Sequence, residues 1–462
     1  MPLQELLVLA VHILCSVQLL QCVKLRDITR SHLSSHLVTQ LYPRSPSVLS
    51  WRISSTFPCT IMSDPLSLYN QHIESAIRRE DGTQLRELLR IRSLEAAHAT
   101  EIYIVEGGSV PSPMPDAWEV IPDIVQKRFA AGGALTANDW VSCSEHLSEC
   151  LTAFINVVQS ESAWVLPALH ALCTDLRVVA GEADKQLFKE RMKKRMLEKS
   201  ERILKRAFMT TNNDRRTMEE GSKRAGTLAI INQLLKVYFS LNNLRLCANL
   251  TRTVNAPNFP PFENYSISDR VTYKFFSGRL HLYDDRVREA TVDLTYAFSH
   301  MHQDQFENLR HVLLYLIPAQ ILTGLLPSEK MLRKYNMHWY MKISEAIRTG
   351  NLRLFDDAVE QYEEFFITRA LWLAVEKMRP LVYRSLIRRV GNSISDATEI
   401  QNKIPLDKIR IALLMCQKEM DLDEIECVVA NLIYCNYIKG YISHKVGYLV
   451  LSKKDPFPQL QV

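Results

Sequence analysis

The residues that could support catalysis are scattered along this chain and form no recognisable catalytic motif. The sequence contains no phosphate-binding glycine loop, no HExxH zinc motif and no GxSxG nucleophile motif. His300 and His302 lie two residues apart, and such a pair on a helix points to different sides. His338 is isolated. We therefore expect a protein that is not an enzyme and that has no metal site and no cofactor.

Ten cysteines are present, with no CxxC pair and no series of short spacings. This pattern predicts neither a zinc site nor a disulfide framework, and it fits a reducing compartment. Cys173, Cys247, Cys416 and Cys427 lie among apolar residues at helical spacing, so we expect buried thiols there.

Positive charge is concentrated between residues 185 and 224, which we call the basic segment. It holds fourteen Lys and Arg against six Asp and Glu, although the whole chain has a net charge of only +5. Its candidate contact residues are Lys189, Lys193, Lys194, Arg195, Arg202 and Lys205. A solvated helix face explains the pattern, and so does a contact with an anion, either RNA phosphate or an acidic peptide.

A second group of cations, the winged-helix cluster, lies near the C-terminus. Its candidate nucleic-acid-binding residues are Arg379, Arg384, Arg388, Arg389, Lys439, Lys445, Lys453 and Lys454. The helix expected to start at Asp421 also carries Asp423, Glu424 and Glu426 near that start, and these carboxylates would repel DNA phosphates. No aromatic RNP motif is present, so we expect any nucleic-acid binding here to tolerate many sequences.

The elements around this cluster predict a winged helix over residues 384–455. One helix should end near Val390, before the polar break at residues 391–393, and a second should begin at Ile404 with Pro405 in its first turn. A third helix should begin at Asp421. The apolar period then changes from 3.6 to 2 at residues 441–443 and 447–451, which predicts a hairpin.

The chain before it, from Met62, reads as one helix after another, so we expect helical repeats at 62–225 and 226–383. Gly278, Ala290, Leu294 and Ala297 have the small-residue spacing of a tetratricopeptide helix pair. Pro318 should kink or end its helix. The predicted fold is an all-α, tetratricopeptide-like solenoid followed by a winged helix.

Residues 431–444, which run from Asn431 to His444, resemble the end of a PCI domain. That module is shared by the proteasome lid, the COP9 signalosome and translation initiation factor 3. Residues 175–178, 232–239, 270–274 and 455–458 resemble one PCI subfamily, the mRNA-export subunits. The resemblance extends over roughly residues 62–458 and brings no catalytic motif with it.

The resemblance implies a subunit of a complex that couples transcription to mRNA export. The implied partners are a larger PCI-containing scaffold protein, a small acidic disordered peptide, and RNA or double-stranded nucleic acid, with no membrane. The implied location is the nucleus, including the nuclear pore, and to some extent the cytoplasm. The alternative is a scaffold subunit like those of the COP9 signalosome or the proteasome lid, without nucleic-acid binding.

Residues 1–61 differ from the rest of the chain. The apolar run from Leu6 to Val23 resembles a signal peptide or a short membrane span, but no basic residue precedes it. We expect this extension to have no stable fold and to belong to the gene model or an isoform, with a targeting segment as the alternative. Residues 456–462 are expected to form a short tail.

Overall fold

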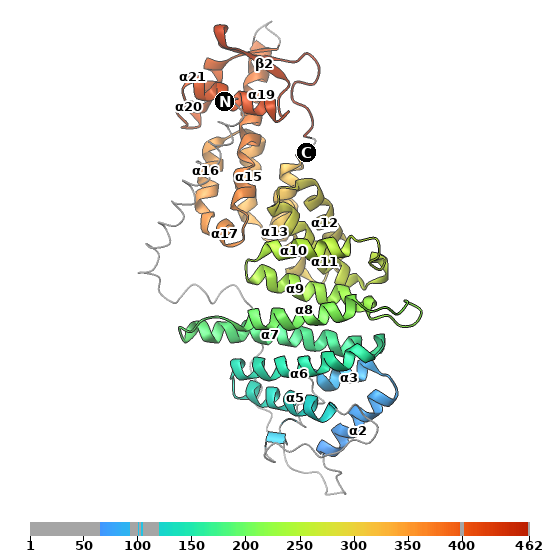
Figure 1. The fold of residues 1–462 in the computed structure, drawn as a ribbon. Coiled ribbons are helices and arrows are strands. Elements are labelled where there is room, and N and C mark those ends of the chain that lie inside the picture. Colours follow the sequence, from blue (N-terminus) through green and yellow to red (C-terminus); the bar gives the residue numbers. More distant parts are fainter. Residues whose placement is uncertain (1–64, 93–99, 101–102, 105–119, 398–401, 461–462) are drawn as a thin grey trace, which may run out of the picture. The chain divides into compact units, whose positions relative to one another are not determined.

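The structure, a computed structural model, describes residues 65–92, 100, 103–104, 120–397 and 402–460. The predictions for residues 1–61 lie outside these residues. In the described part the chain is almost entirely α-helical, with one small sheet near its C-terminus (Figure 1).

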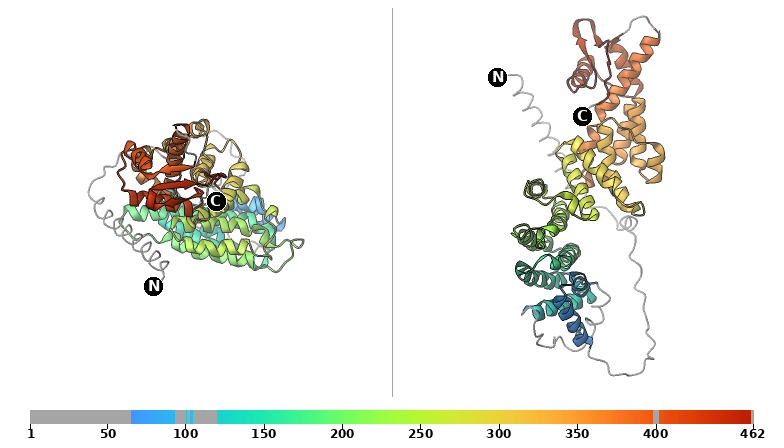
Figure 2. Two further views of the ribbon diagram at one scale, coloured as in Figure 1. Left: turned by 90° about the horizontal axis from the view of Figure 1, so that it is seen from above. Right: turned by 90° about the vertical axis from the view of Figure 1, so that its right-hand side faces the viewer.

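Consecutive helices stack on one another through the first half of the chain (Figures 1 and 2). They are α2 (Pro65–Arg78), α3 (Gly82–Leu89), α5 (Ile121–Thr136), α6 (Trp140–Ser160), α7 (Leu166–Lys189), α8 (Met196–Asn212), α9 (Thr227–Ser240) and α10 (Cys247–Val254). Helix α7 packs against α3, α6, α8 and α9. The helical stretch Ala163–Lys189 is long and apolar enough to cross a membrane, with a mean hydropathy of 1.3, and packing inside the protein accounts for that character.

The stack continues with a second set of helices. They are α11 (Ile267–Tyr283), α12 (Val287–Ser299), α13 (Phe306–Leu322), α14 (Glu329–Lys334), α15 (His338–Thr349), α16 (Leu352–Gln361), α17 (Glu363–Thr368), α18 (Trp372–Glu376) and α19 (Arg379–Ala397). Gly278 lets α11 approach α12, because a Cβ there would lie 2.6 Å from Leu294 Cγ. This close approach is the small-residue packing that the spacing predicts.

Helix α13 continues to Leu322, beyond Pro318, so Pro318 does not end it. A proline at position 318 cannot donate a hydrogen bond to the carbonyl of Leu314. The hydroxyl of Tyr340, which is fully buried, donates to that carbonyl at 2.7 Å. A side chain from α15 thus satisfies the acceptor that the proline leaves open.

The winged helix follows the solenoid without a linker. It consists of α19, β1 (Lys403–Pro405), α20 (Leu406–Met415), α21 (Leu422–Tyr434), β2 (Gly440–Ser443) and β3 (Tyr448–Leu451). The sheet has the antiparallel order β1-β3-β2. Its residues share one hydrophobic core with the solenoid, since Leu449 of β3 and Leu309 of α13 belong to the same buried cluster.

Two predictions about these elements were wrong. Helix α19 continues through residues 391–393. Gly391 serves close packing instead of a break, since a Cβ there would lie 2.8 Å from Ile404 Cδ1. The next helix begins at Leu406, so Ile404 and Pro405 precede it. They form a third strand paired with β3, and Pro405, which lacks an N–H, occupies the end of this edge strand.

The seven cysteines in the described part of the chain are all free thiols. Cys173 and Cys247 are buried as predicted, and Cys416 is partly buried. The prediction was wrong for Cys427, which is exposed because it lies on the solvent side of α21.

Candidate nucleic-acid interface

Arg379, at the start of α19, forms ion pairs with carboxylates. It pairs with Glu376 at 3.1 Å and with Asp356 of α16, and its guanidinium lies over the ring of Phe355. Asp356 also pairs with Lys418, whose Nζ lies 3.3 Å away. Arg379 therefore joins the solenoid to the winged helix, and its charge is compensated.

Arg384, one turn further on, holds two separate segments of backbone. Its Nε donates to the carbonyl of Tyr437 at 3.0 Å, and its Nη2 donates to the carbonyl of Pro458 at 2.7 Å. Burial lowers the pKa of this guanidinium, and the nearby Arg388 lowers the pKa further. Leu460 packs against the same core, so the predicted tail is folded back on the protein as far as residue 460.

Five cations of the winged-helix cluster are exposed, and within the described residues their side chains make no hydrogen bond or ion pair. They are Arg388, Arg389, Lys445, Lys453 and Lys454. The eighth member, Lys439, lies 3.5 Å from Asp455. The structure thus divides the predicted site into two structural arginines, one exposed ion pair and five available cations.

These available cations do not all lie together. Lys439 and Lys453 flank the same end of the β2–β3 hairpin, since Ser452 N donates to Lys439 O at 2.8 Å. Arg388 follows Arg384 by one turn of α19, and Arg384 donates to the carbonyls of Tyr437 and Pro458, close to Lys439 in the chain and in the fold. Lys445 lies in the turn at the opposite end, about 10 Å or more along the strands.

The acidic start of α21 has structural roles. Glu424 N donates to Asp421 Oδ1 at 2.7 Å, and Asp421 N donates to Glu424 Oε2 at 3.1 Å, which is a capping box. Glu426 binds the wing, since its Oε2 lies 2.8 Å from His444 Nδ1. The carboxylates stand at the end of the helix that a major-groove reader would insert.

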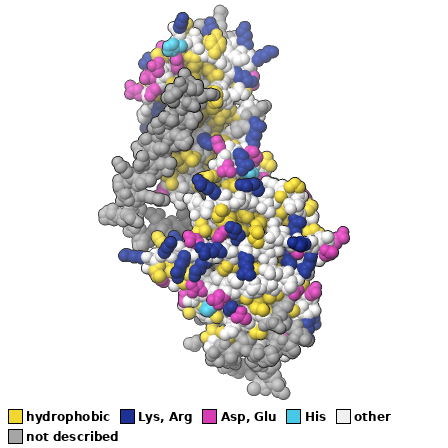
Figure 3. Space-filling view, viewed as in Figure 1, with side chains coloured by type: hydrophobic (Ala, Val, Ile, Leu, Met, Phe, Trp, Pro, Cys, Tyr) yellow, Lys and Arg dark blue, Asp and Glu magenta, His cyan; other side chains and the backbone are white. Residues whose placement is uncertain are grey.

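In the basic segment, all six candidates are exposed and, in the described chain, their side chains have no carboxylate partner. They are Lys189, Lys193, Lys194, Arg195, Arg202 and Lys205. The side-chain Nζ of Lys194 lies 4.3 Å from the ring centroid of Phe188. Figure 3 shows Lys and Arg side chains gathered on this part of the solenoid surface.

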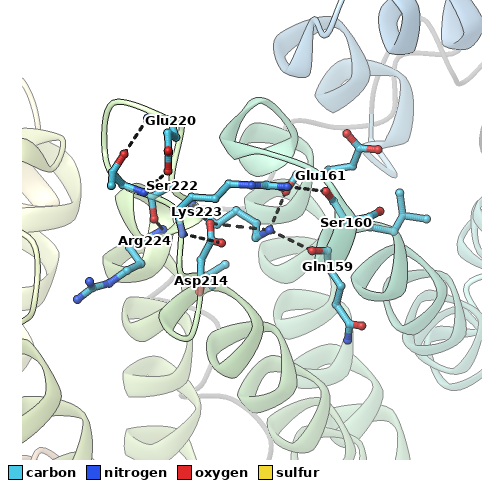
Figure 4. A network of polar contacts seen from close by, with 12 residues as sticks. Gln159, Ser160, Glu161, Asp214, Glu220, Ser222, Lys223 and Arg224 are labelled. Carbon is cyan, nitrogen blue, oxygen red and sulfur yellow. Dashed lines mark hydrogen bonds and ion pairs between the residues drawn. The ribbon is translucent and has the colours of Figure 1, made fainter.

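Other cations of the basic segment bind the C-terminal end of α6, as Figure 4 shows. Lys223 has a side chain only 3% exposed, and its Nζ donates to Glu161 O at 2.7 Å and Gln159 O at 3.3 Å. Arg216 donates to the carbonyl of Ser160 at 2.7 Å. Cations are favourable at a helix C-terminus, where carbonyls have no helical partner. No feature of the sequence distinguished these residues from the exposed ones.

In the part of the chain that the structure describes, no group of three His, Cys, Asp or Glu side chains could hold a metal ion. His300 instead stacks on Tyr296, with ring centroids 4.0 Å apart. In the described part of the winged helix, five cations are thus exposed and unpaired, whereas Arg379, Arg384 and the carboxylates of α21 make structural contacts.

Comparison with known proteins agrees with this architecture. Residues 359–453 match the PCI domain model. PCI domain-containing protein 2 from Xenopus laevis is 33% identical over 404 residues, covering 86% of this chain and 98% of the relative. Enhanced ethylene response protein 5 from Arabidopsis thaliana is 35% identical, covering 83% and 93%. A Neurospora crassa relative, Protein CSN12 homolog, is 32% identical, covering 70% and 78%.

These relatives confirm the PCI family resemblance that was predicted from residues 431–444. The helical solenoid with its C-terminal winged helix confirms the predicted fold. Because the identity extends over nearly the whole of the Xenopus relative, the chain belongs to the family of PCI domain-containing protein 2.

Proposed function

We propose that this protein is a non-enzymatic subunit of a nuclear complex that couples transcription to mRNA export. In this proposal its PCI domain docks onto a larger PCI-containing scaffold protein and a small acidic disordered peptide. The exposed cations then contribute a binding surface for RNA or DNA that tolerates many sequences. The observation that carries the proposal is the winged helix, which is fixed on the solenoid and yet leaves binding surface exposed.

The docking part rests on apolar side chains that the winged helix leaves in solvent. Met415 is 82% exposed, Tyr434 89%, Tyr441 63% and Val446 66%. Strand β2, which contains Tyr441, is also an edge of the sheet and can accept another strand. Large apolar side chains that a domain leaves in solvent on several of its elements are candidates for contact with another protein.

The nucleic-acid part rests on Arg388, Arg389, Lys445, Lys453 and Lys454. They are exposed, and the rest of the described protein leaves them unpaired. Their spread over two ends of the hairpin favours contact with an extended phosphate backbone over recognition of single bases.

The experiment is purification of the tagged chain from nuclear extract, with mass identification of the bound proteins. We expect recovery of a PCI-containing scaffold protein and a small acidic polypeptide, and salt-dependent RNA binding by the recovered complex. Recovery of the chain with signalosome or proteasome-lid subunits and no RNA affinity would contradict the proposal and support the scaffold alternative.

A double variant tests the docking surface. Met415→Asp with Tyr441→Asp should abolish recovery of the scaffold and leave the thermal unfolding midpoint unchanged, since both side chains are exposed. Leu373→Asp is the matched control, because Leu373 is 71% exposed but lies on α18. Equal loss of the scaffold in the control would show that the winged helix is not the docking surface.

A further inference from the structure

A groove of about 1270 Å³ lies between α9, α11, α13 and the turn that follows α17, apart from the winged-helix cluster. All its lining residues lie in the described part of the chain, and none of them is Asp or Glu. Its Lys, Arg and His lining residues are Lys236, Arg279, Arg369, His300, His302 and His311. The lining is therefore positively charged, and the nearby carboxylate of Asp304 lies at its edge, 3.1 Å from His302 Nδ1.

Arg279 of α11 is the most unusual of these cations. Its Cζ lies 4.4 Å from the ring centroids of both Phe239 and Tyr315. Its Nε is buried without a hydrogen-bond partner, and among the described residues its guanidinium has no carboxylate partner. Burial lowers the pKa of Arg279, and the charge of Arg369 lowers the pKa further. The side chain is partly exposed and its guanidinium stacks on aromatic rings, so its charge is stabilised without a carboxylate and is open to an anion from solution.

Arg279, Arg369 and His311 converge on one part of the groove. Arg369 and Arg279 both lower the pKa of the His311 imidazole, after burial, which has the largest effect. On its own helix, Glu307 raises that pKa and Arg310 lowers it. Tyr315 connects the three residues: Arg279 Cζ lies 4.4 Å from its ring centroid, and its hydroxyl donates to Arg369 O at 3.4 Å. His311 lies one turn before Tyr315 on α13, and all three cationic or imidazole side chains line the same groove.

A divalent anion matches this group better than a carboxylate does. One carboxylate would leave a net positive charge beside two arginines, whereas a phosphate monoester carries about −1.5 to −2 at pH 7. Guanidinium groups also bind phosphate oxygens in pairs. Around the cations the groove has exposed apolar side chains, Ile267, Tyr283 and Ile367, which suit aliphatic or aromatic neighbours of the phosphate.

We propose that Arg279, His311 and Arg369 form a phosphate-monoester site that holds a phosphorylated serine or threonine within an apolar segment of a partner protein. A peptide is favoured over RNA because Ile267 and Ile367, two of the three exposed large apolar side chains of the groove, are aliphatic and give a base no ring on which to stack. The site does not include the winged helix, so a test of this site and a test of the proposed function can give different results.

The test measures fluorescence anisotropy with the full chain and three pools of fluorescein-labelled 11-residue peptides. All pools have mixed Leu, Ile, Val and Phe flanks, and the central residue is phosphoserine, serine or glutamate. We expect the phosphoserine pool to bind at least about tenfold more tightly than the other two. Equal binding of the glutamate pool would overturn the proposal in favour of an acidic-peptide site. Displacement of the phosphoserine pool by an RNA dodecamer better than by free phosphoserine would overturn it in favour of nucleic acid.

Single variants test whether the phosphoserine peptides bind in the groove. Arg369→Gln and His311→Gln should each weaken binding of the phosphoserine pool about tenfold or more, while their thermal midpoints stay unchanged. Arg288→Gln removes the same charge from an exposed position on α12 outside the groove and should change nothing. Unchanged affinity in both groove variants would disprove the site. Arg279→Gln is less informative, because it also removes packing against four aromatic rings.

A proton-linked readout separates direct contact from a structural effect. A bound dianion stabilises the charged imidazole, so the pKa of His311 should rise on addition of phosphoserine peptide, as seen by NMR of the imidazole. Binding should also weaken more from pH 6.5 to 8 in the wild type than in His311→Gln. A His311 pKa that does not move on saturation would contradict contact with the phosphate.

Discussion

The winged helix and the basic segment both divide their cations between structural and exposed positions, but the structural ones stabilise different features of the fold. In the winged helix, Arg379 pairs with carboxylates and Arg384 joins two backbone segments. In the basic segment, Lys223 and Arg216 bind the last carbonyls of α6. In both regions, the location of unsatisfied carbonyls and carboxylates decides which cations are available for a ligand.

The exposed cations of the two regions also differ in how they are held. Those of the basic segment come from one continuous stretch of chain, the last residue of α7, the α7–α8 connection and α8. Those of the winged helix come from α19, the wing and the residues after β3. The second arrangement exists only when the tertiary structure is formed.

The largest expected effect separates Lys223 from its exposed neighbours. Lys223→Met leaves the buried carboxylate of Asp214 without its nearby ammonium and removes the donors to Glu161 O and Gln159 O. We expect a loss of about 3 kcal/mol in unfolding free energy. Urea unfolding followed by tryptophan fluorescence measures it, since Trp164 Nε1 donates to Glu161 at 3.1 Å. Lys205→Met, the control, should stay within about ±0.5 kcal/mol, and a similar loss there would contradict the division.

A smaller effect separates two arginines on α19. Arg384→Ala should cost about 2 kcal/mol, because it removes charged donors from the carbonyls of Tyr437 and Pro458. It should also release the tail, so that protease cleaves after residue 454. Arg388→Ala, one turn further along, should change neither the thermal midpoint nor the cleavage pattern. Identical behaviour of the two variants would show that Arg384 does not hold the tail.

A third variant concerns the junction between the solenoid and the winged helix. Asp356 pairs with both Arg379 and Lys418, and its side chain is 33% exposed. Asp356→Asn should lower unfolding free energy by about 1 kcal/mol without separating the transitions of solenoid and winged helix, because their core is shared. Calorimetry measures this, and two resolved transitions in the wild type would contradict a continuous structure.

Much of this architecture could be predicted from the sequence because it depends on local pattern. The apolar stripe of α21 and the alternation at residues 441–451 identify the winged helix, and Gly278 with Leu294 identifies a close helix pair. Strand β1 was missed because three residues carry no period of their own and form a strand only by pairing with β3. The division of the arginines could not be predicted, because the partners of Arg384 lie 53 and 74 residues away.

The smallest expected effect concerns pH at the wing. The hydrogen bond between His444 and Glu426 raises the pKa of His444 above the ordinary value of about 6.5, and the charge of Glu426 raises that pKa further. Because the folded pKa is raised, the stabilisation is complete below about pH 6.5 and is lost as the pH rises through the folded pKa. NMR titration should show the higher pKa in the wild type and its return to the ordinary value in Glu426→Gln. An unchanged His444 pKa in that variant would contradict the contact.

The most direct test of the central claim is the salt dependence of RNA binding by the purified complex with two sets of charge reversals. Arg388→Glu, Arg389→Glu and Lys445→Glu together should lower the slope of log affinity against log salt by about 2 to 3, equally for all sequences. Folding should be unchanged, since these side chains are exposed. Reversal of Lys193, Lys194 and Arg195 to Glu is the matched comparison and should leave the slope unchanged. Loss of RNA binding in the second set with retention in the first would place the nucleic-acid surface on the solenoid and contradict the account.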